Sequence, residues 1–143
     1  MTTLNEAKRV LYRRVISTWL PQVSFSSTTQ LTFGPESFKP PANQPWCRVT
    51  LSELFRSQVT LNGPGHRQFS SEATLVGQIF GVPGTTSESD MDSYADTFRK
   101  TFEGVSLSSD DIYIFGGTIL PFGIIDNWIQ TNVQISMIFR ERR

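Results

Sequence analysis

Apolar side chains recur at helical spacing over the first 20 residues of the chain. One stripe is formed by Leu4, Ala7, Leu11, Val15 and Trp19. Thr3 and Glu6 have the spacing of a capping box, in which each side chain satisfies a backbone amide of the other residue. Pro21 disfavours helical geometry at the residue before it, so we expect a helix over 4–20 that ends at this proline.

Residues 22–45 follow no single period. Val23, Phe25 and the run 30–33 have strand character and predict a short strand or β pair. The prolines between 34 and 45 lack the amide donor that a sheet requires, so we expect a Pro-rich surface loop over 34–45.

A strict alternation of apolar and polar residues begins at Trp46 and predicts a long β-hairpin. The apolar positions are Cys47, Val49, Leu51 and Phe55 in the first strand, and Phe69, Ala73, Leu75 and Ile79 in the second. The turn signal Asn62-Gly63-Pro64-Gly65 separates them, so the hairpin tip is expected over 62–67.

A second amphipathic helix is predicted after Pro83-Gly84. Thr86 or Ser87 is its expected cap, and Gly104 suits the left-handed position after its last turn. Its apolar stripe comprises Met91, Tyr94, Ala95, Phe98 and Phe102.

Two further strands are predicted in the last third of the chain. The first covers 112–120, contains a bulge signal at Gly116-Gly117 and ends at a break over 121–123. The second alternates over 129–139 and carries an uncharged polar row that is expected on an exposed face, made of Gln130, Asn132, Gln134 and Ser136.

The order of these elements predicts an α+β fold with a single mainly antiparallel β-sheet and two helices packed on one face. No internal repeat or linker divides the chain, so residues 1–143 are expected to form one domain. The last four residues, 140–143, are expected to be a flexible tail.

Composition then removes several classes of function. The 143 residues include 13 Lys+Arg and 13 Asp+Glu, and this neutral balance argues against general nucleic-acid binding. The single cysteine, Cys47, is expected on the apolar face of a strand, and the single histidine, His66, is expected in a turn. Neither position favours a catalytic role. No apolar stretch approaches the roughly 20 residues of a membrane-spanning helix. We expect a soluble protein that is not an enzyme and has no metal or cofactor.

The net charge of zero conceals a separation of charge along the chain. Residues 4–14 carry a net +3, residues 85–111 a net −5 and residues 140–143 a net +2. Such segments can simply be solvated faces, or they can meet on neighbouring copies of the chain, as a head-to-tail ring requires. The candidate interface residues are Arg9, Arg13, Asp92 and Asp96.

Four local features resemble the tail terminator proteins of long-tailed bacteriophages. They are the basic N-terminal helix, the strand start Pro45-Trp46-Cys47-Arg48-Val49, the segment from His66-Arg67-Gln68-Phe69 through 73–80 to Pro83-Gly84, and the strand Trp128-Ile129-Gln130-Thr131-Asn132-Val133 that finishes with Ile138-Phe139. Together they cover nearly the whole chain, although the loop over 34–45 is longer than the family pattern.

This resemblance implies a virion protein, assembled in the host cytoplasm, that forms a typically hexameric ring. The ring would cap the tail tube, end its polymerisation and join the tail to the head-side connector or neck protein. Double-stranded DNA would be only a cargo passing through the lumen. On this interpretation Asn62, His66 and Arg67 are candidates for docking to the tube or connector, or for lining the lumen.

Two alternatives stay open. A head-completion or neck adaptor protein of the head-tail connector shares the size and the ring habit. A small-ligand binding domain belongs to a different class, and it would require a pocket with convergent polar groups.

Overall fold

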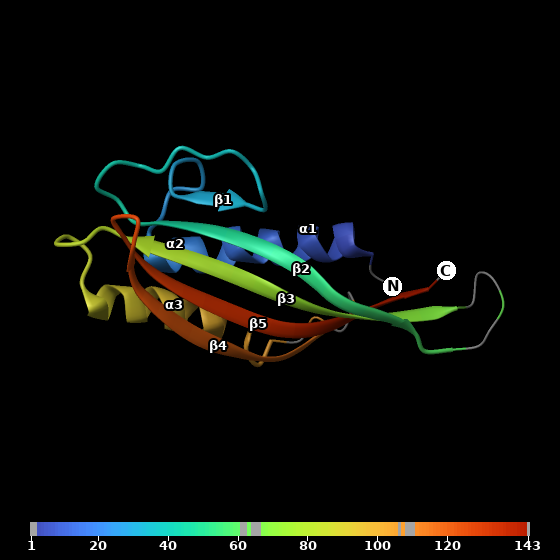
Figure 1. The fold of residues 1–143 in the computed structure, drawn as a ribbon. Helices are drawn as coiled ribbons and strands as arrows, with labels where there is room; N and C mark the ends of the chain where they lie inside the picture. The colour runs from blue at the N-terminus through green and yellow to red at the C-terminus, as the bar shows by residue number, and fades with distance from the viewer. Residues whose placement is uncertain (1–2, 61–62, 64–66, 106, 108–110, 143) are drawn as a thin grey trace.

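A twisted five-stranded sheet is the frame of the molecule, and two helical segments pack against it (Figure 1). The computed structural model describes residues 3–60, 63, 67–105, 107 and 111–142. The strands are β1 (Leu31–Phe33), β2 (Trp46–Gln58), β3 (Gln68–Gly81), β4 (Ile112–Ile125) and β5 (Trp128–Arg142). Their order across the sheet is β1-β2-β3-β5-β4.

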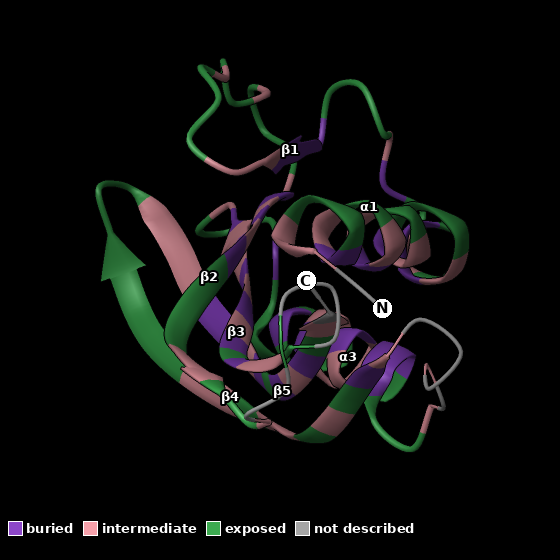
Figure 2. Ribbon diagram, turned by 90° about the vertical axis from the view of Figure 1, so that its right-hand side faces the viewer, coloured by how far each residue is buried: buried purple, intermediate pink, exposed green. Residues whose placement is uncertain are grey.

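The sheet is mainly antiparallel, with one parallel pair at its edge. β2 pairs with β3, β3 with β5 and β5 with β4, all antiparallel, whereas β1 lies parallel to β2. The helical segments cover the same face of the sheet, and the buried residues lie between the two layers (Figure 2). The predicted α+β class, with a single mainly antiparallel sheet and helices on one face, is confirmed.

The N-terminal helix begins as predicted but does not end at Pro21. The capping box forms, because the Glu6 amide donates to Thr3 Oγ1 at 3.2 Å and the Thr3 amide to Glu6 Oε2 at 3.5 Å. The helix then runs through α1 (Leu4–Arg14), the π-helical segment η1 (Val15–Trp19) and α2 (Leu20–Val23). The prediction that Pro21 stops the helix is wrong, since Leu20 is helical and the proline sits in the first turn of α2.

The π-helical segment explains why the proline is tolerated. In η1 the Leu20 amide bonds to the carbonyl of Val15, five residues back, so the backbone is wider here than in an α-helix. A proline at the start of a helical turn removes an amide that has little need of a partner. In an α-helix, residues four apart are rotated by about 40° relative to each other around the helix axis, so a stripe with this spacing drifts away from the core. The wider π-helical turn reduces this drift. Trp19 therefore stays buried beneath the same helix as Leu11.

The segment after the helix forms no β pair of its own. Val23 ends α2, and the short strand β1 pairs with residues Cys47 to Val49 of β2. The predicted short strand is confirmed as β1. The alternative of a β pair between Val23, Phe25 and residues 30–33 does not form, because β2 supplies the partner from a distance in sequence. Residues 34–45 form the predicted loop without regular structure.

The predicted hairpin of β2 and β3 is confirmed, with one correction. The register shifts between Glu53 and Phe55, which marks a β-bulge. A bulge turns the following side chains to the other face, so Phe55 is 60% exposed instead of buried with Cys47, Val49 and Leu51.

The second helix, α3 (Glu88–Phe102), matches its prediction closely. Ser87 is the cap, with its hydroxyl accepting from the Asp90 amide at 3.0 Å, and Gly104 has the left-handed φ of +69°. Four members of the predicted apolar stripe are buried, and Tyr94 is half-buried. Phe98 packs over Gly77 of β3, where a side chain on the strand would collide with its ring.

β4 continues beyond the break that its sequence suggests. The strand crosses Pro121 and Gly123 with a register shift and pairs with β5 as far as Ile125. The predicted end over 121–123 is wrong because a bulge absorbs the proline that a regular ladder would exclude. A second shift between Ile114 and Gly116 confirms the predicted bulge.

The polar row of β5 lies on the uncovered face, but it is less exposed than expected. Ser136 is exposed, Gln130 and Gln134 are half-buried, and Asn132 is only 9% exposed. β5 lies between β3 and β4, so side chains from both neighbours shield the row.

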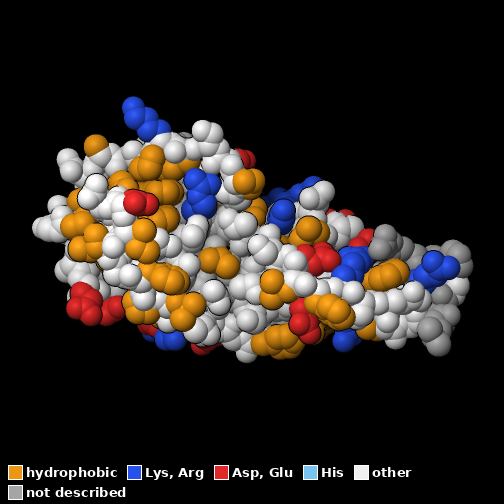
Figure 3. Space-filling view, in the orientation of Figure 1, with side chains coloured by type: hydrophobic (Ala, Val, Ile, Leu, Met, Phe, Trp, Pro, Cys, Tyr) orange, Lys and Arg blue, Asp and Glu red, His pale blue; other side chains and the backbone are white. Residues whose placement is uncertain are grey.

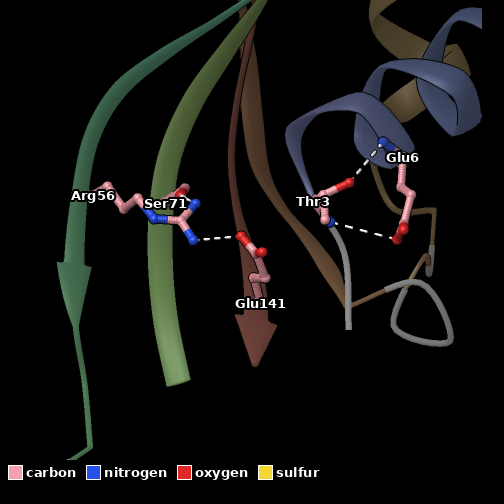
Figure 4. A network of polar contacts seen from close by, with 5 residues as sticks. All are labelled: Thr3, Glu6, Arg56, Ser71 and Glu141. Carbon is pink, nitrogen blue, oxygen red and sulfur yellow. Dashed lines mark hydrogen bonds and ion pairs between the residues drawn. The ribbon is translucent and has the colours of Figure 1, made fainter. Parts of the chain in front are cut away.

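The expected flexible tail is largely strand. Arg140 to Arg142 pair with Gln68 to Ser70 of β3, and Arg143 lies outside the described residues. Arg56 of β2 bonds to Ser71 Oγ at 3.2 Å and forms an ion pair with Glu141 of β5 (Figure 4). This bridge across three strands holds the C-terminus in the arm that projects beyond the helices in Figure 1.

Candidate subunit interface

The two helical segments cover the same face of the sheet but lie over opposite edges of it. Tyr12 of α1 stacks on Phe33 of β1 at 4.4 Å between ring centroids, and its hydroxyl accepts from the Leu51 amide of β2 at 3.1 Å. Arg99 of α3 packs against Gly117 of β4, where an added Cβ would lie 2.8 Å from Arg99 Cγ. α1 therefore flanks the β1/β2 side of the sheet and α3 flanks the β4 side (Figure 2).

The basic candidates lie on α1 and face solvent. Arg9 and Arg13 are exposed, and neither forms an ion pair with another described residue. Arg9 precedes Tyr12 by one turn, so it lies on the β1/β2 side of the helix. Arg14 behaves differently, because its Nε donates to the Thr101 carbonyl at 2.7 Å and joins the two helices.

The acidic candidates differ from each other. Asp92 is exposed and has no ion pair among the described residues. Asp96 lies 2.8 Å from both Lys100 Nζ and Arg99 Nη2. Hydrogen bonds from Lys100 and then Arg99 lower the pKa of Asp96. Asp92 is thus available to a neighbouring molecule, whereas Asp96 is already neutralised within its own helix.

The structure does not bring the basic and acidic candidates together within one chain. Arg9 and Arg13 are on α1, whereas Asp92 and Asp96 are on α3. Asp96 bonds to Arg99, which packs against Gly117 of β4, so the acidic residues lie toward the β4 edge. Of the candidates at the hairpin tip, Arg67 is exposed just before β3, and Asn62 and His66 lie outside the described residues.

Sequence reasoning missed the apolar side chains of the uncovered sheet face. Leu54 and Phe115 are the extra residues of two β-bulges and are 66% and 67% exposed. Between them lies a hollow of about 150 Å³ over Thr74 and Ser136. Figure 3 shows this face, where hydrophobic side chains lie scattered as far as the arm. The bulge signal at Gly116-Gly117 was the one hint in the sequence.

The strand start that contributes to the phage resemblance anchors the Pro-rich loop. Trp46 stacks on Phe80 at 4.2 Å and meets Phe38 of the loop at 5.1 Å and Trp128 at 6.0 Å. Arg48 then donates from Nη1 to two loop carbonyls, that of Gly34 among them at 2.6 Å. This end of the uncovered face is therefore a packed aromatic cluster.

Comparison with known proteins supports the fold and leaves function open. No family model matches the chain, and no curated protein matches it. A solved structure whose name is only a sequence identifier matches 94% of this chain and 95% of its own length. Its TM-score is 0.53 and its sequence identity 16%, so the likeness concerns the fold alone.

Two observations concern the reactive and metal-binding side chains of the described residues. Cys47 is fully buried, and this burial strongly raises the pKa of its thiol, so the reactive thiolate is suppressed. No group of three or more His, Cys, Asp and Glu side chains is placed to hold a metal ion in the described part of the chain.

Two open surface hollows lie near the helix end and the loop. One of about 470 Å³ is lined mainly by Ser, Pro and apolar residues around Leu20 and Phe25, and one of about 540 Å³ lies along 39–44.

Among the helices that the structure describes, none has the length and apolar content to cross a bilayer.

Proposed function

We propose that this protein is a structural, non-enzymatic ring protein of the phage tail terminator type. Copies of the chain would associate head to tail, cap the tail tube and present a surface to the connector or neck protein. The observation that carries the proposal is the placement of basic residues on α1 and acidic residues on α3, over opposite edges of one sheet. The basic edge of one copy can contact the acidic edge of the next, whereas two like edges would repel each other. A contact between two different surfaces is the kind that closes a ring.

The fold is consistent with this role. The helices cover one face of the sheet except along the arm, so the uncovered face, the two sheet edges and the outer helix faces are the surfaces left for partners. A terminator must reproduce the binding surface of the tube on one side and lack it on the other, which a head-to-tail ring with two unlike faces allows. No cofactor or catalytic group is required.

The sharpest test of the association is a charge reversal at Asp92, since Asp96 is occupied by Arg99 and Lys100. We expect Asp92→Lys to weaken oligomer formation in sedimentation velocity by about ten-fold in apparent Kd, as one lost charge pair predicts. Adding Arg13→Glu should restore part of the affinity. Ser93→Lys places a lysine on another exposed face of α3, with a charge change of one unit instead of two, and serves as the control.

The capping role has its own test. Particles assembled without this protein should carry overlong tails in electron micrographs, because nothing would end tube growth. Tails of normal length that fail to join heads would instead favour the neck adaptor. Tails and joining that are both unaffected would contradict a role in the virion.

A further inference from the structure

The outer edge of β4 is unusually open to pairing with another strand. None of its 14 residues is charged, and Phe122 and Ile124 near its end are exposed. Monomeric proteins commonly protect such edges with charged side chains, short strands or bulges. β4 has two bulges and Pro121, which also hinders pairing at its own position, but residues 116–120 form a regular ladder with β5 between these features. This edge is therefore built more like an interior strand than like a protected one.

The opposite edge of the sheet is blocked along only half of its length. β1 pairs with Cys47 to Val49 of β2, and Tyr12 accepts the next outward amide, that of Leu51. Beyond this point, residues 52–58 of β2 pair with β3 on one side and with no described strand on the other. The sheet thus offers a second, shorter free edge.

The strand directions allow the two edges to meet. Successive antiparallel pairs β2–β3, β3–β5 and β5–β4 make β4 run opposite to β2. Two copies placed side by side in the same orientation would therefore set β4 of one antiparallel to β2 of the next. Antiparallel pairing is the more stable arrangement per residue.

The charges of the helices favour the same arrangement. Glu88, Asp92, Asp96, Arg99 and Glu103 recur at helical spacing and form one side of α3. With Lys100, which pairs with Asp96, this side has a net charge of −2, and Arg99 places it over β4. Lys8 and Arg9 lie within one turn of Tyr12, which places them on the β2 side of α1. Continuing the sheet from β4 to β2 would bring these two helix sides together.

We propose that β4 of one copy pairs antiparallel with residues 52–58 of β2 in the next copy, joining the two sheets head to tail. The partner is a second copy of this chain, and the contact combines backbone pairing with attraction between α3 and α1. The inference rests on the ring proposed above and names the edge through which the ring closes.

A symmetric contact between two β4 edges is the main competitor. It would also be antiparallel, but it would place α3 beside α3 and bring two faces of net charge −2 together. Like charges across an interface oppose association, so the head-to-tail pair is favoured.

Cysteine cross-linking distinguishes these arrangements. Thr118 and Ser52 are exposed. Thr118 pairs with Gln134, and Ser52 pairs with Thr74, which in turn pairs with Ser136, so both lie on the uncovered face. Copies carrying Thr118→Cys are mixed with copies carrying Ser52→Cys and treated with a short bifunctional maleimide, which tolerates an unknown register. Buried Cys47 contributes no background.

We expect the mixture to form covalent dimers roughly ten-fold faster than the Thr118→Cys copies alone, as a preference of one charge pair implies. Faster cross-linking of Thr118→Cys alone would overturn the proposal in favour of the symmetric contact. No cross-linking in the mixture at any concentration would overturn it as well.

Amide hydrogen exchange on the unmodified chain gives an independent reading. As the protein concentration rises, amides of residues 116–120 should exchange several-fold more slowly, because the pairing protects them. Unchanged exchange in these amides while the chain associates would contradict the edge contact.

The outcomes separate this inference from the proposed function. Cross-linked edges together with normal tails in particles lacking the protein would leave the edge contact standing and remove the capping role. Overlong tails without the edge contact would do the reverse.

Discussion

Single residues decide how closely the helices approach the sheet, and Gly77 is the clearest case. A Cβ at this position would lie 2.8 Å from Cζ of Phe98, whose side chain is fully buried among the other core residues. The contact with Phe98 thus requires glycine at this position of β3.

We predict that Gly77→Ala lowers the free energy of unfolding by about 2 kcal/mol, because the ring of Phe98 has no room to move. Chemical denaturation measures the effect. Gly116→Ala is the control, since a Cβ at Gly116 meets nothing within 4 Å, and it should be close to neutral. Equal stability of both variants would show that the core repacks freely around α3.

Asp96 illustrates a charge whose role is within its own helix. The ammonium of Lys100 and the guanidinium of Arg99 hold the pKa of Asp96 below its ordinary value. A carboxyl with a lowered pKa in the folded state stabilises the fold above its unfolded pKa of about 3.9, and the stabilisation is lost as pH falls through the lowered value.

We therefore predict that Asp96→Asn lowers the melting temperature at pH 7, and that this deficit shrinks as the pH falls below the unfolded pKa and the native carboxyl takes up its proton. The effect is small because the group is exposed. Asp92→Asn, without an ion pair among the described residues, is the control and should differ little from the native chain at pH 7 or at low pH. A deficit of Asp96→Asn that persists at low pH would contradict the electrostatic origin.

At the scale of elements, the arm built from the ends of β2, β3 and β5 projects past the helices. Arg56 ties the three strands together through Ser71 and Glu141, and its guanidinium lies 5.0 Å from the ring centroid of Phe69. The arm thus depends on this bridge more than on a helix-covered core.

Glu141→Gln should reduce the stability of the arm by about 1 kcal/mol, since a charge-assisted bond is replaced by a neutral one. Amide exchange in Gln68 to Ser70 should speed up, while exchange at the helix-covered centre of β3 should not. Glu72→Gln is the control, because Glu72 is exposed on the neighbouring strand β3 without an ion pair to any described residue. Uniform acceleration across the sheet would show instead that the arm does not open separately.

The elements also show where sequence patterns succeed and fail. α3 followed its apolar stripe and its cap closely, because both act between residues a few positions apart. Phe55 failed because a bulge, invisible to the alternation, reversed its side of the strand. The prediction that the helix ends at Pro21 failed because the turn before the proline is π-helical, with the Leu20 amide bonded to the carbonyl five residues back.

At the scale of the whole molecule, the candidate site is an arrangement of charges about the sheet. Arg9 is on α1, which lies over the β1/β2 edge, and Asp92 is on α3, which lies over the β4 edge, and no ion pair joins them among the described residues. The segregation of charge was predictable from the sequence. The side of the sheet on which each helix lies was not, because it follows from the strand order.

We predict that association weakens between about 0.1 M and 1 M sodium chloride, since the screening length falls from about 10 Å to about 3 Å. The Asp92→Lys variant, having lost the attraction, should respond much less. Sedimentation velocity at several salt concentrations measures both. Association that strengthens with salt would indicate a contact carried by the apolar side chains of the uncovered face.

The sequence by itself determined the two helical segments, the long hairpin and the α+β class, because helix and strand periods and caps are local properties of the chain. The tertiary structure decided the parallel placement of β1, the exposed bulge residues Leu54 and Phe115, and the two free edges of the sheet. These depend on which distant strands pair and in what register. The surfaces open to a partner follow from that long-range pairing, which the order of residues along the chain does not display.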